Sequence, residues 1–174
     1  DQGKVTSQVS SVISNFLFKY DNITYIEYPL NKDFGTYKNN LFKNCSKDYI
    51  FQVDADEFLA APLIGCVHDL LVSEPDVDLF WIPRLNIVSG IRPEYAVEQG
   101  WKLESVGEFS DVVNWGSDYQ GRLCKSNLRW EGKVHERLTG ATTMAQLPYE
   151  MEYCLYHPKT IGRQKSQNEF YKNM

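Results

Sequence analysis

The chain has little of what marks several common classes of protein. Its 174 residues hold four widely spaced cysteines and no C-x-x-C pair, so we expect buried thiols and neither a zinc motif nor a disulfide framework. No apolar run is long enough to cross a bilayer, and the start DQGKVTSQ is no signal peptide. The net charge of −5, from 18 basic and 23 acidic residues, argues against nucleic acid as a partner. We predict a reduced, cytoplasmic protein without a transmembrane segment.

Nothing in the sequence divides the chain either. Hydrophobic residues make up 43% and charged residues 24%, a balance typical of globular proteins. We find no internal repeat, low-complexity tract or linker, and 174 residues suit one domain that buries a substantial core. The prediction is therefore a single domain over residues 1–174.

Helix-type and strand-type segments alternate along the first half of the chain. Apolar residues at helical spacing predict three helices, over 5–17, 35–45 and 62–71. Runs rich in β-branched and aromatic residues predict three strands, over 22–30, 49–54 and 77–84. The run at 49–54 is almost continuously apolar or aromatic up to its end, as buried parallel strands are. This alternation predicts an α/β fold, with a mostly parallel central sheet flanked by crossover helices.

The pattern loosens in the second half. Residues 86–120 hold glycines, aromatics and acids without a clear period, and we expect long loops that build a site. Two short strands are predicted at 121–125 and 152–157, followed by a polar helix over 160–174. An α/β nucleotide-binding unit usually begins with a strand, whereas this chain opens on a loop and a helix. We therefore expect the domain to lack its first strand or strands at the N-terminus.

Three acids crowd the end of the strand at 49–54, where the sequence reads YIFQVDADEFL. Asp54 and Asp56, with Glu57 beside them, can turn toward the crevice beyond a strand end, where open α/β sheets bind ligands. Two hard oxygen ligands this close suit Mn²⁺ or Mg²⁺, which removes their repulsion and completes its shell with water and substrate phosphate. The alternative is an acidic turn that binds nothing, since isolated D-x-D matches are common.

Four segments, in order, resemble one known family. KDYIFQVDADEFL resembles the D-x-D segment of family 2 glycosyltransferases, which have the GT-A fold and use nucleotide-sugar donors. Upstream, DFGTYKNNLF is similar to the family's D-F-x-x-x-R-N-x-x-L segment, with Lys38 where arginine is usual. DYQGRLCKSNLRWEGKVHERLTG is similar to a stretch of a branch that includes lipopolysaccharide-core β-glucosyltransferases. LYHPKTIGRQKSQNEFY resembles that branch's closing histidine and the helix after it.

The resemblance implies a GT-A-type fold and an activity. We expect metal-dependent, inverting transfer of a hexose from a nucleotide diphosphate sugar, with a UDP-sugar favoured, to a glycan, a lipid-linked saccharide or another hydroxyl acceptor. The metal, Mn²⁺ or Mg²⁺, is assigned to Asp56, with Asp54 sharing it or holding the donor ribose, and to His157. For His157 the alternative is an ordinary histidine at a strand end.

The same resemblance suggests the remaining roles. Glu136 is the first choice for the base that takes the acceptor's proton, and Asp118 is the second. Each of these two acids could instead form a surface pair with a neighbouring arginine, and Glu57 is expected to support the metal acids. The residues expected to bind the nucleotide sugar are Asp1, Asp33, Lys38, Asn39, Asp54 and Arg122.

Aromatic residues around the strand at 121–125 suggest an acceptor cleft. Trp115, Tyr119 and Trp130 can stack on the C–H faces of a sugar, although core packing is the more usual place for tryptophan. For Arg122 and Arg84, structural ion pairs stay an alternative to contacts with the donor.

Two other functions stay open. A sugar-phosphate nucleotidyltransferase also uses acid-bound Mg²⁺, but it normally has a glycine-rich loop near its start, and none is visible here. A non-catalytic carbohydrate-binding module is the third possibility, and the presence of Asp54, Asp56 and His157 together argues against it.

Overall fold

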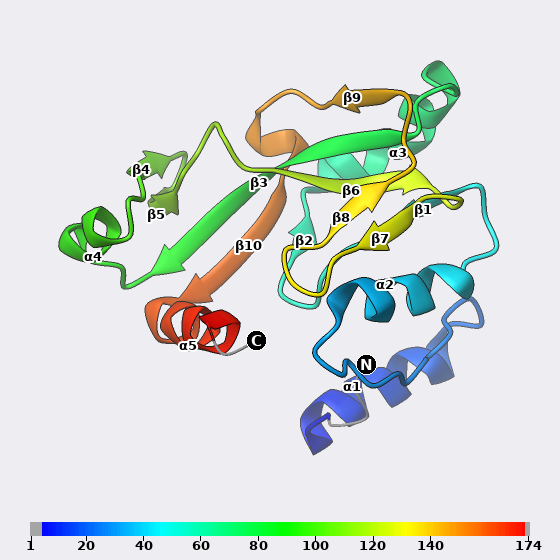
Figure 1. Cartoon of the computed structure of the whole chain (residues 1–174), viewed down its shortest axis with the longest axis horizontal. Helices are drawn as coiled ribbons and strands as arrows, with labels where there is room; N and C mark the ends of the chain where they lie inside the picture. Colours follow the sequence, from blue (N-terminus) through cyan, green and yellow to red (C-terminus); the bar gives the residue numbers. More distant parts are fainter. Residues whose placement is uncertain (1–4, 173–174) are drawn as a thin grey trace. The chain divides into compact units, whose positions relative to one another are not determined.

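The computed structural model describes residues 5–172, which form two compact units (Figure 1). We call residues 5–46 and 129–139 the helical unit, and residues 47–128 and 140–172 the sheet unit. Asp1 lies outside the described residues, and the single domain over 1–174 stays a prediction. Within residues 5–172 no helix is both long and apolar enough to pass through a bilayer.

The sheet unit is organised around one long strand, β3 (Leu79–Ser89), which changes partners halfway along (Figure 1). Its first half pairs antiparallel with β6 (Tyr119–Lys125), and β6 in turn pairs antiparallel with β1 (Tyr49–Phe51). Its second half pairs parallel with β10 (Leu155–Thr160), which holds β2 (Phe58–Leu59) on its other edge. The path across the sheet is therefore β1-β6-β3-β10-β2.

Shorter elements extend this sheet. β9 (Met144–Gln146) pairs parallel with the first half of β3. β5 (Phe109–Val113) pairs antiparallel with the second half and carries β4 (Leu103–Val106) beyond it. Three helices and a single 3₁₀ turn complete the described part of the unit: α3 (Ala61–Ser73), α4 (Pro93–Glu98), η1 (Met151–Tyr153) and α5 (Ile161–Lys172).

The main core of the sheet unit lies where α3 packs on the sheet. Leu63 of α3 is fully buried against Phe80 and Ile82 of β3, Leu123 of β6 and Leu155 of β10. Each such side chain contributes about 1.5–3 kcal/mol by leaving water, so this cluster fixes β3, β6 and β10 relative to one another. Those three strands carry six polar residues of the candidate site: Arg84, Asn86, Gln120, Arg122, His157 and Lys159.

The prediction of an α/β fold with a mostly parallel central sheet, of the GT-A type, is wrong. The sheet is mostly antiparallel, and in the described chain only β10 and β9 pair parallel, both with β3. β1 and β3 do run in the same direction, but β6 lies between them and is antiparallel to both. The apolar run at 49–54 indicated burial, and burial does not determine the direction of the neighbouring strand.

Other elements divide between confirmed and wrong predictions. The four predicted helices are confirmed as α1 (Ser7–Lys19), α2 (Phe34–Lys43), α3 and α5. The strand predicted at 22–30 is wrong, since this segment has no regular structure and pairs with no strand in the described chain. The loops predicted over 86–120 are wrong in part, because β3 continues to Ser89 and α4, β4 and β5 follow.

The cysteines are free thiols, with Cys124 and Cys154 buried, Cys66 half-buried and Cys45 exposed. The prediction of free, unbridged cysteines is thus confirmed, and that of burial is confirmed for two of them. Burial raises the pKa of the Cys154 thiol to about 12, so this group is a poor nucleophile at neutral pH.

In the helical unit, the turn of a hairpin meets the first turn of α2. The hairpin pairs β7 (Arg129–Glu131) with β8 (Arg137–Thr139). The Phe34 N–H donates to the carbonyl of Lys133 at 3.0 Å, and the Gly35 N–H donates to the carbonyl of Gly132 at 3.2 Å. The hairpin thereby satisfies N–H groups that a helix N-terminus leaves open.

This approach requires glycine at position 35. A Cβ at Gly35 would lie 2.6 Å from the carbonyl oxygen of Gly132, closer than real Cβ contacts come. We expect Gly35→Ala to lower the free energy of unfolding by about 1–3 kcal/mol, because either α2 or the hairpin must shift.

Urea unfolding measures the effect, and Gly65→Ala is its control. Gly65 is also helical, but a Cβ there would meet nothing within 4 Å. The control should leave stability unchanged or raise it by about 0.5–1 kcal/mol. Equal midpoints for the two variants would contradict the close approach of α2 to the hairpin.

Asp78, a half-buried carboxylate, joins the start of β3 to the segment that leads into β9. Its Oδ2 accepts from the Thr142 N–H and the Thr143 N–H at 2.8 and 3.1 Å, and its Oδ1 lies 2.9 Å from Lys125 Nζ. Hydrogen bonding from Lys125, followed by that from Thr142 and Thr143, holds the pKa of Asp78 well below its ordinary value.

The depressed pKa of Asp78 predicts a pH-dependent contribution to stability. The contribution should be complete above the unfolded pKa of about 3.9 and should disappear as the pH falls below it. We expect Asp78→Asn to be less stable than the wild type near neutral pH, with the difference shrinking from about pH 5 downward. Thermal unfolding between pH 3 and pH 7 tests this. Asp76→Asn, at an exposed neighbouring acid, should show no such trend, and a difference that stays constant with pH would reject the assignment.

Candidate functional site

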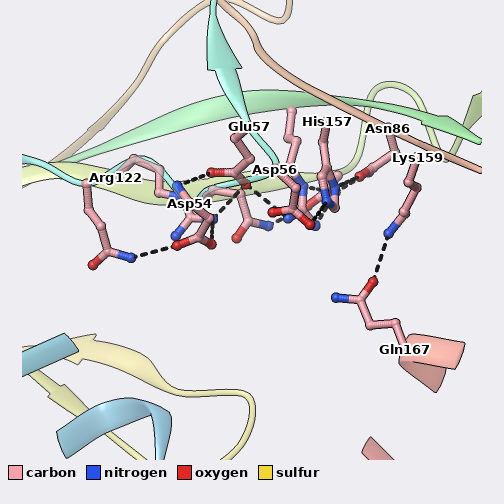
Figure 2. Close-up of polar contacts among 12 residues, drawn as sticks. Asp54, Asp56, Glu57, Asn86, Arg122, His157, Lys159 and Gln167 are labelled. Carbon is pink, nitrogen blue, oxygen red and sulfur yellow. Dashed lines mark hydrogen bonds and ion pairs between the residues drawn. The ribbon is translucent and has the colours of Figure 1, made fainter. Parts of the chain in front are cut away.

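The crowding of acids after β1 is relieved first by a buried arginine of β6. Arg122 is 3% exposed, and its Nη2 lies 2.6 Å from Asp54 Oδ2 and 2.7 Å from Glu57 Oε1 (Figure 2). Burial alone would lower the pKa of Arg122, but the charges of Asp54 and Glu57 outweigh it and raise this pKa. Gln52 Nε2 donates to the other oxygen of Asp54 at 3.1 Å. Two of the three acids therefore form a structural ion-pair cluster.

A second cluster surrounds Asp118, which immediately precedes β6. Nε and Nη2 of Arg84 each lie 2.9 Å from Asp118 Oδ2, and Asn86 Nδ2 donates to the same oxygen. Gln120 Nε2 donates to Oδ1 at 2.7 Å. Burial alone would raise the pKa of Asp118, but Arg84, Asn86 and Gln120 outweigh it and hold this pKa below its ordinary value. Asp118 is thus an ionised acceptor with both oxygens engaged.

The third acid, Asp56, faces His157 of β10. His157 is buried, and its Nε2 lies 3.4 Å from Asp56 Oδ2. Arg163 Nη2, from the first turn of α5, lies 3.2 Å from the same oxygen. Hydrogen bonding from His157 is the largest cause that holds the pKa of Asp56 well below its usual range, and the charges of His157 and Arg163 add to it.

Asn86 determines which nitrogen of His157 carries a proton. Because Asp118 is ionised and accepts from Asn86 Nδ2, the other end of the amide, Oδ1, must face His157, and it lies 2.9 Å from Nδ1 (Figure 2). Nδ1 is therefore the donor in this contact. With its proton in place, Nε2 donates toward the carboxylate of Asp56. Without that proton, as metal binding requires, Nε2 presents a lone pair on the side of Asp56. This is the arrangement of a metal-binding histidine whose other nitrogen is held by a neighbouring acceptor.

Two of these residues, Asp56 and His157, could together hold a divalent cation. No group of three or more His, Cys, Asp or Glu side chains in residues 5–172 is placed to hold a metal ion. Asp56 and His157 supply one carboxylate and one imidazole nitrogen, and Mg²⁺-like ions commonly use few protein ligands beside water and substrate phosphate. The oxygens of Asp54 accept from Arg122 and Gln52, and its share in the metal stays a prediction.

Lys159 extends the site along β10. Its Nζ donates to Gln167 Oε1 of α5 at 3.3 Å (Figure 2). Burial lowers the pKa of Lys159 to about 8, and the charge of Arg84 acts in the same direction.

Four residues predicted from the sequence lie in the helical unit and form a cluster there. Lys38 Nζ lies 2.6 Å from Glu136 Oε1 and 4.3 Å from the ring centroid of Trp130. Asn39 donates to the Trp130 carbonyl at 2.8 Å and accepts from its N–H at 2.9 Å. A fifth residue, Asp33, caps α2, with Oδ1 accepting from the Thr36 N–H at 2.8 Å. Asn39 therefore holds the backbone of Trp130, and Asp33 stabilises the N-terminus of α2. Binding of the donor by these two residues stays a prediction.

The aromatic residues predicted to hold the acceptor are well packed. Trp115 and Tyr119 both pack edge-on against Tyr149, with ring centroids 4.5 and 5.0 Å apart. Trp130 is buried in the helical unit and packs on Phe42. Their role in binding a sugar stays a prediction.

No protein-family model and no curated protein matches this chain. The resemblance to family 2 glycosyltransferases therefore stays a prediction that rests on the four sequence segments.

Sequence reasoning missed several residues of the site, among them Asn86, Lys159 and Arg163. Asn86 fell in a segment interpreted as a loop, although it continues the strand begun at Leu79. Lys159 follows His157 at the strand spacing of two, a signal that was available.

Proposed function

We propose that this chain is a glycosyltransferase that moves a hexose from a nucleotide diphosphate sugar, with a UDP-sugar favoured, to a hydroxyl group of a saccharide or lipid-linked acceptor. The observation that carries the proposal is the pair of Asp56 and His157, with Asn86 holding the histidine Nδ1. The D-x-D sequence at 54–56 and the other three similar segments support it. The proposal depends on this site and does not require a parallel sheet.

The charges around the pair suit a metal–diphosphate ligand. The carboxylates of Asp54, Asp56, Glu57 and Asp118 are matched in number by the cations of Arg84, Arg122, Lys159 and Arg163. Mn²⁺ or Mg²⁺ would stabilise the negative charge that develops on the departing diphosphate. Its two positive charges would equal the two negative charges of the diphosphate of a sugar nucleotide, so the loaded site would stay neutral.

In the proposed transfer reaction, the acids Asp118 and Glu136 have different roles. Asp118 orients Asn86, and through it His157, while both of its oxygens accept hydrogen bonds from Arg84, Asn86 and Gln120. Glu136 stays the first candidate, and Asp118 the second, for the base that activates the acceptor hydroxyl in an inverting reaction. Oε1 of Glu136 lies 2.6 Å from Lys38 Nζ, so this ion pair and an acceptor hydroxyl would compete for the same oxygen.

A donor screen tests the proposal. The chain is incubated with UDP-glucose, UDP-galactose, UDP-N-acetylglucosamine or GDP-mannose, with Mn²⁺ or Mg²⁺, and release of the nucleoside diphosphate is measured. We expect release from one donor above the rate without protein, abolished by EDTA and restored by added metal.

Two outcomes would replace the proposal. Formation of a sugar nucleotide from UTP and a sugar phosphate would indicate a nucleotidyltransferase. Glycan binding by calorimetry, without metal-dependent binding of any donor, would indicate a carbohydrate-binding module. A cytoplasmic location stays a prediction under each of these functions.

A further inference from the structure

Lys159 differs from the other cations of the site in what it contacts. It follows His157 by two residues on β10, so both side chains lie on the same face of the sheet. Lys159 is half-buried, and its one polar partner in the described chain is the neutral amide of Gln167. No carboxylate of residues 5–172 lies within ion-pair distance of its Nζ.

The neighbouring cations all have carboxylate partners. Arg84 pairs with Asp118 at 2.9 Å, and Arg163 pairs with Asp56 at 3.2 Å. The charges of Asp56 and Asp118 reach Lys159 from beyond ion-pair distance. A partly desolvated ammonium without a carboxylate in direct contact is costly unless a ligand supplies that contact. Lys159 is thus held beside Asp56 and His157 without an anion of its own from the described chain.

The position of the ammonium is set by α5. Arg163 and Gln167 are four residues apart on this helix, so they lie on one face, and Arg163 reaches Asp56. Gln167 reaches Lys159 (Figure 2). The helix therefore fixes Lys159 at a defined place next to the Asp56–His157 pair. A lysine fixed in this way is a point-charge binder of phosphate oxygens.

We propose that Lys159 binds the phosphoryl oxygens of the donor's diphosphate, with Gln167 as the positioning residue that holds its ammonium. The identity of the diphosphate rests on the proposed function. The presence of a phosphoryl-binding site at Lys159 does not, because it follows from the unpaired cation and the helix that orients it.

Calorimetry with inorganic pyrophosphate in EDTA tests the site without any metal or turnover. We expect Lys159→Met to bind pyrophosphate about tenfold more weakly or worse, since one charged contact is lost. Lys159→Arg, which keeps the charge, should stay within about threefold of the wild type. Lys165→Met is the control, because Lys165 is a cation of the same helix that lies over the Tyr95 ring, 4.8 Å from its centroid.

Two results would overturn the proposal. One is equal affinity of Lys159→Met and the wild type for pyrophosphate. The other is a loss of affinity in Lys165→Met as large as that in Lys159→Met, which would indicate that pyrophosphate responds to the overall positive charge and not to a site at Lys159. Parallel titrations with inorganic phosphate and UDP show whether a single phosphate suffices or a diphosphate is needed.

A measurement on the unaltered protein covers the case in which Lys159→Met does not fold. Acylation by acetic anhydride is followed at each lysine by peptide mass spectrometry, with and without pyrophosphate. We expect protection of Lys159 and not of Lys165, and unchanged labelling of Lys159 would reject the site. If no donor is turned over but pyrophosphate still protects Lys159, the transfer reaction fails and the anion site stands. If a donor is turned over while Lys159 stays unprotected, the anion site at Lys159 is rejected and the transfer reaction stands.

Discussion

Replacing Asp56 with asparagine is expected to lower kcat/KM for nucleotide release by about 10²–10³-fold, the usual cost of removing one preorganised electrostatic contact. Asparagine keeps the size of the side chain but removes the charge that faces His157 Nε2 at 3.4 Å. The cation affinity should fall with it, so the Mn²⁺ concentration that gives half-maximal release should rise. The measurement is nucleotide release from the donor identified in the screen, as a function of Mn²⁺.

The control for Asp56→Asn is Asp69→Asn, which makes the same chemical change at an exposed position on α3. Asp69→Asn should keep the wild-type rate and metal dependence. Thermal unfolding of both variants separates loss of activity from loss of structure. An Asp56→Asn protein that releases nucleotide within about threefold of the wild-type rate would remove Asp56 from the chemistry, given the size of effect expected.

Replacing Arg122 with methionine is expected to have the largest effect on stability, about 3–5 kcal/mol, because it leaves buried carboxylate charge unpaired. The Glu57 side chain is 1% exposed, and its Oε1 lies 2.7 Å from Arg122 Nη2. Arg84 lies 3.4 Å from the same oxygen and would compensate only in part. Urea unfolding measures the loss.

A double-mutant cycle identifies the cause of that loss. Adding Glu57→Gln to Arg122→Met removes the stranded charge, so the double variant should recover part of the lost stability. Arg92→Met, at an exposed arginine beside α4, is the matched control and should change stability by less than about 0.5 kcal/mol. Additive effects of the two substitutions at 57 and 122 would show that the pair is not coupled.

The sequence predicted local structure better than it predicted the sheet. Pro62 and the apolar stripe after it are local signals, and α3 begins and ends close to where they indicate. The direction of β1 depends on pairing with β6, whose partner residues Leu123 and Lys125 lie far along the chain. No pattern within residues 49–54 reports that pairing, so a buried antiparallel strand was predicted to be parallel.

For the candidate site too, the sequence indicated local features and missed the contacts between distant segments. The crowding of acids at 54–57 and the histidine at 157 were visible as sequence motifs, and the structure brings Asp56 and His157 together. The contacts that separate the roles of the acids were not visible. Asp54 and Glu57 share Arg122 of β6, and Asn86 reaches His157 only because β10 pairs with the second half of β3.

Because β3 pairs with β6 along its first half and with β10 along its second half, it is the strand that joins the two parts of the sheet. Arg84, at the changeover, spans from Glu57 to Asp118, while Arg122 sits on one half and His157 on the other. A slip of one residue along either ladder would turn Arg122 or His157 to the opposite face and separate it from its acid. Insertions or deletions inside these ladders should therefore be far less tolerated than changes in the connections between them, since the register of β3 sets the positions of Arg122 and His157 as well as the pairing of the strands.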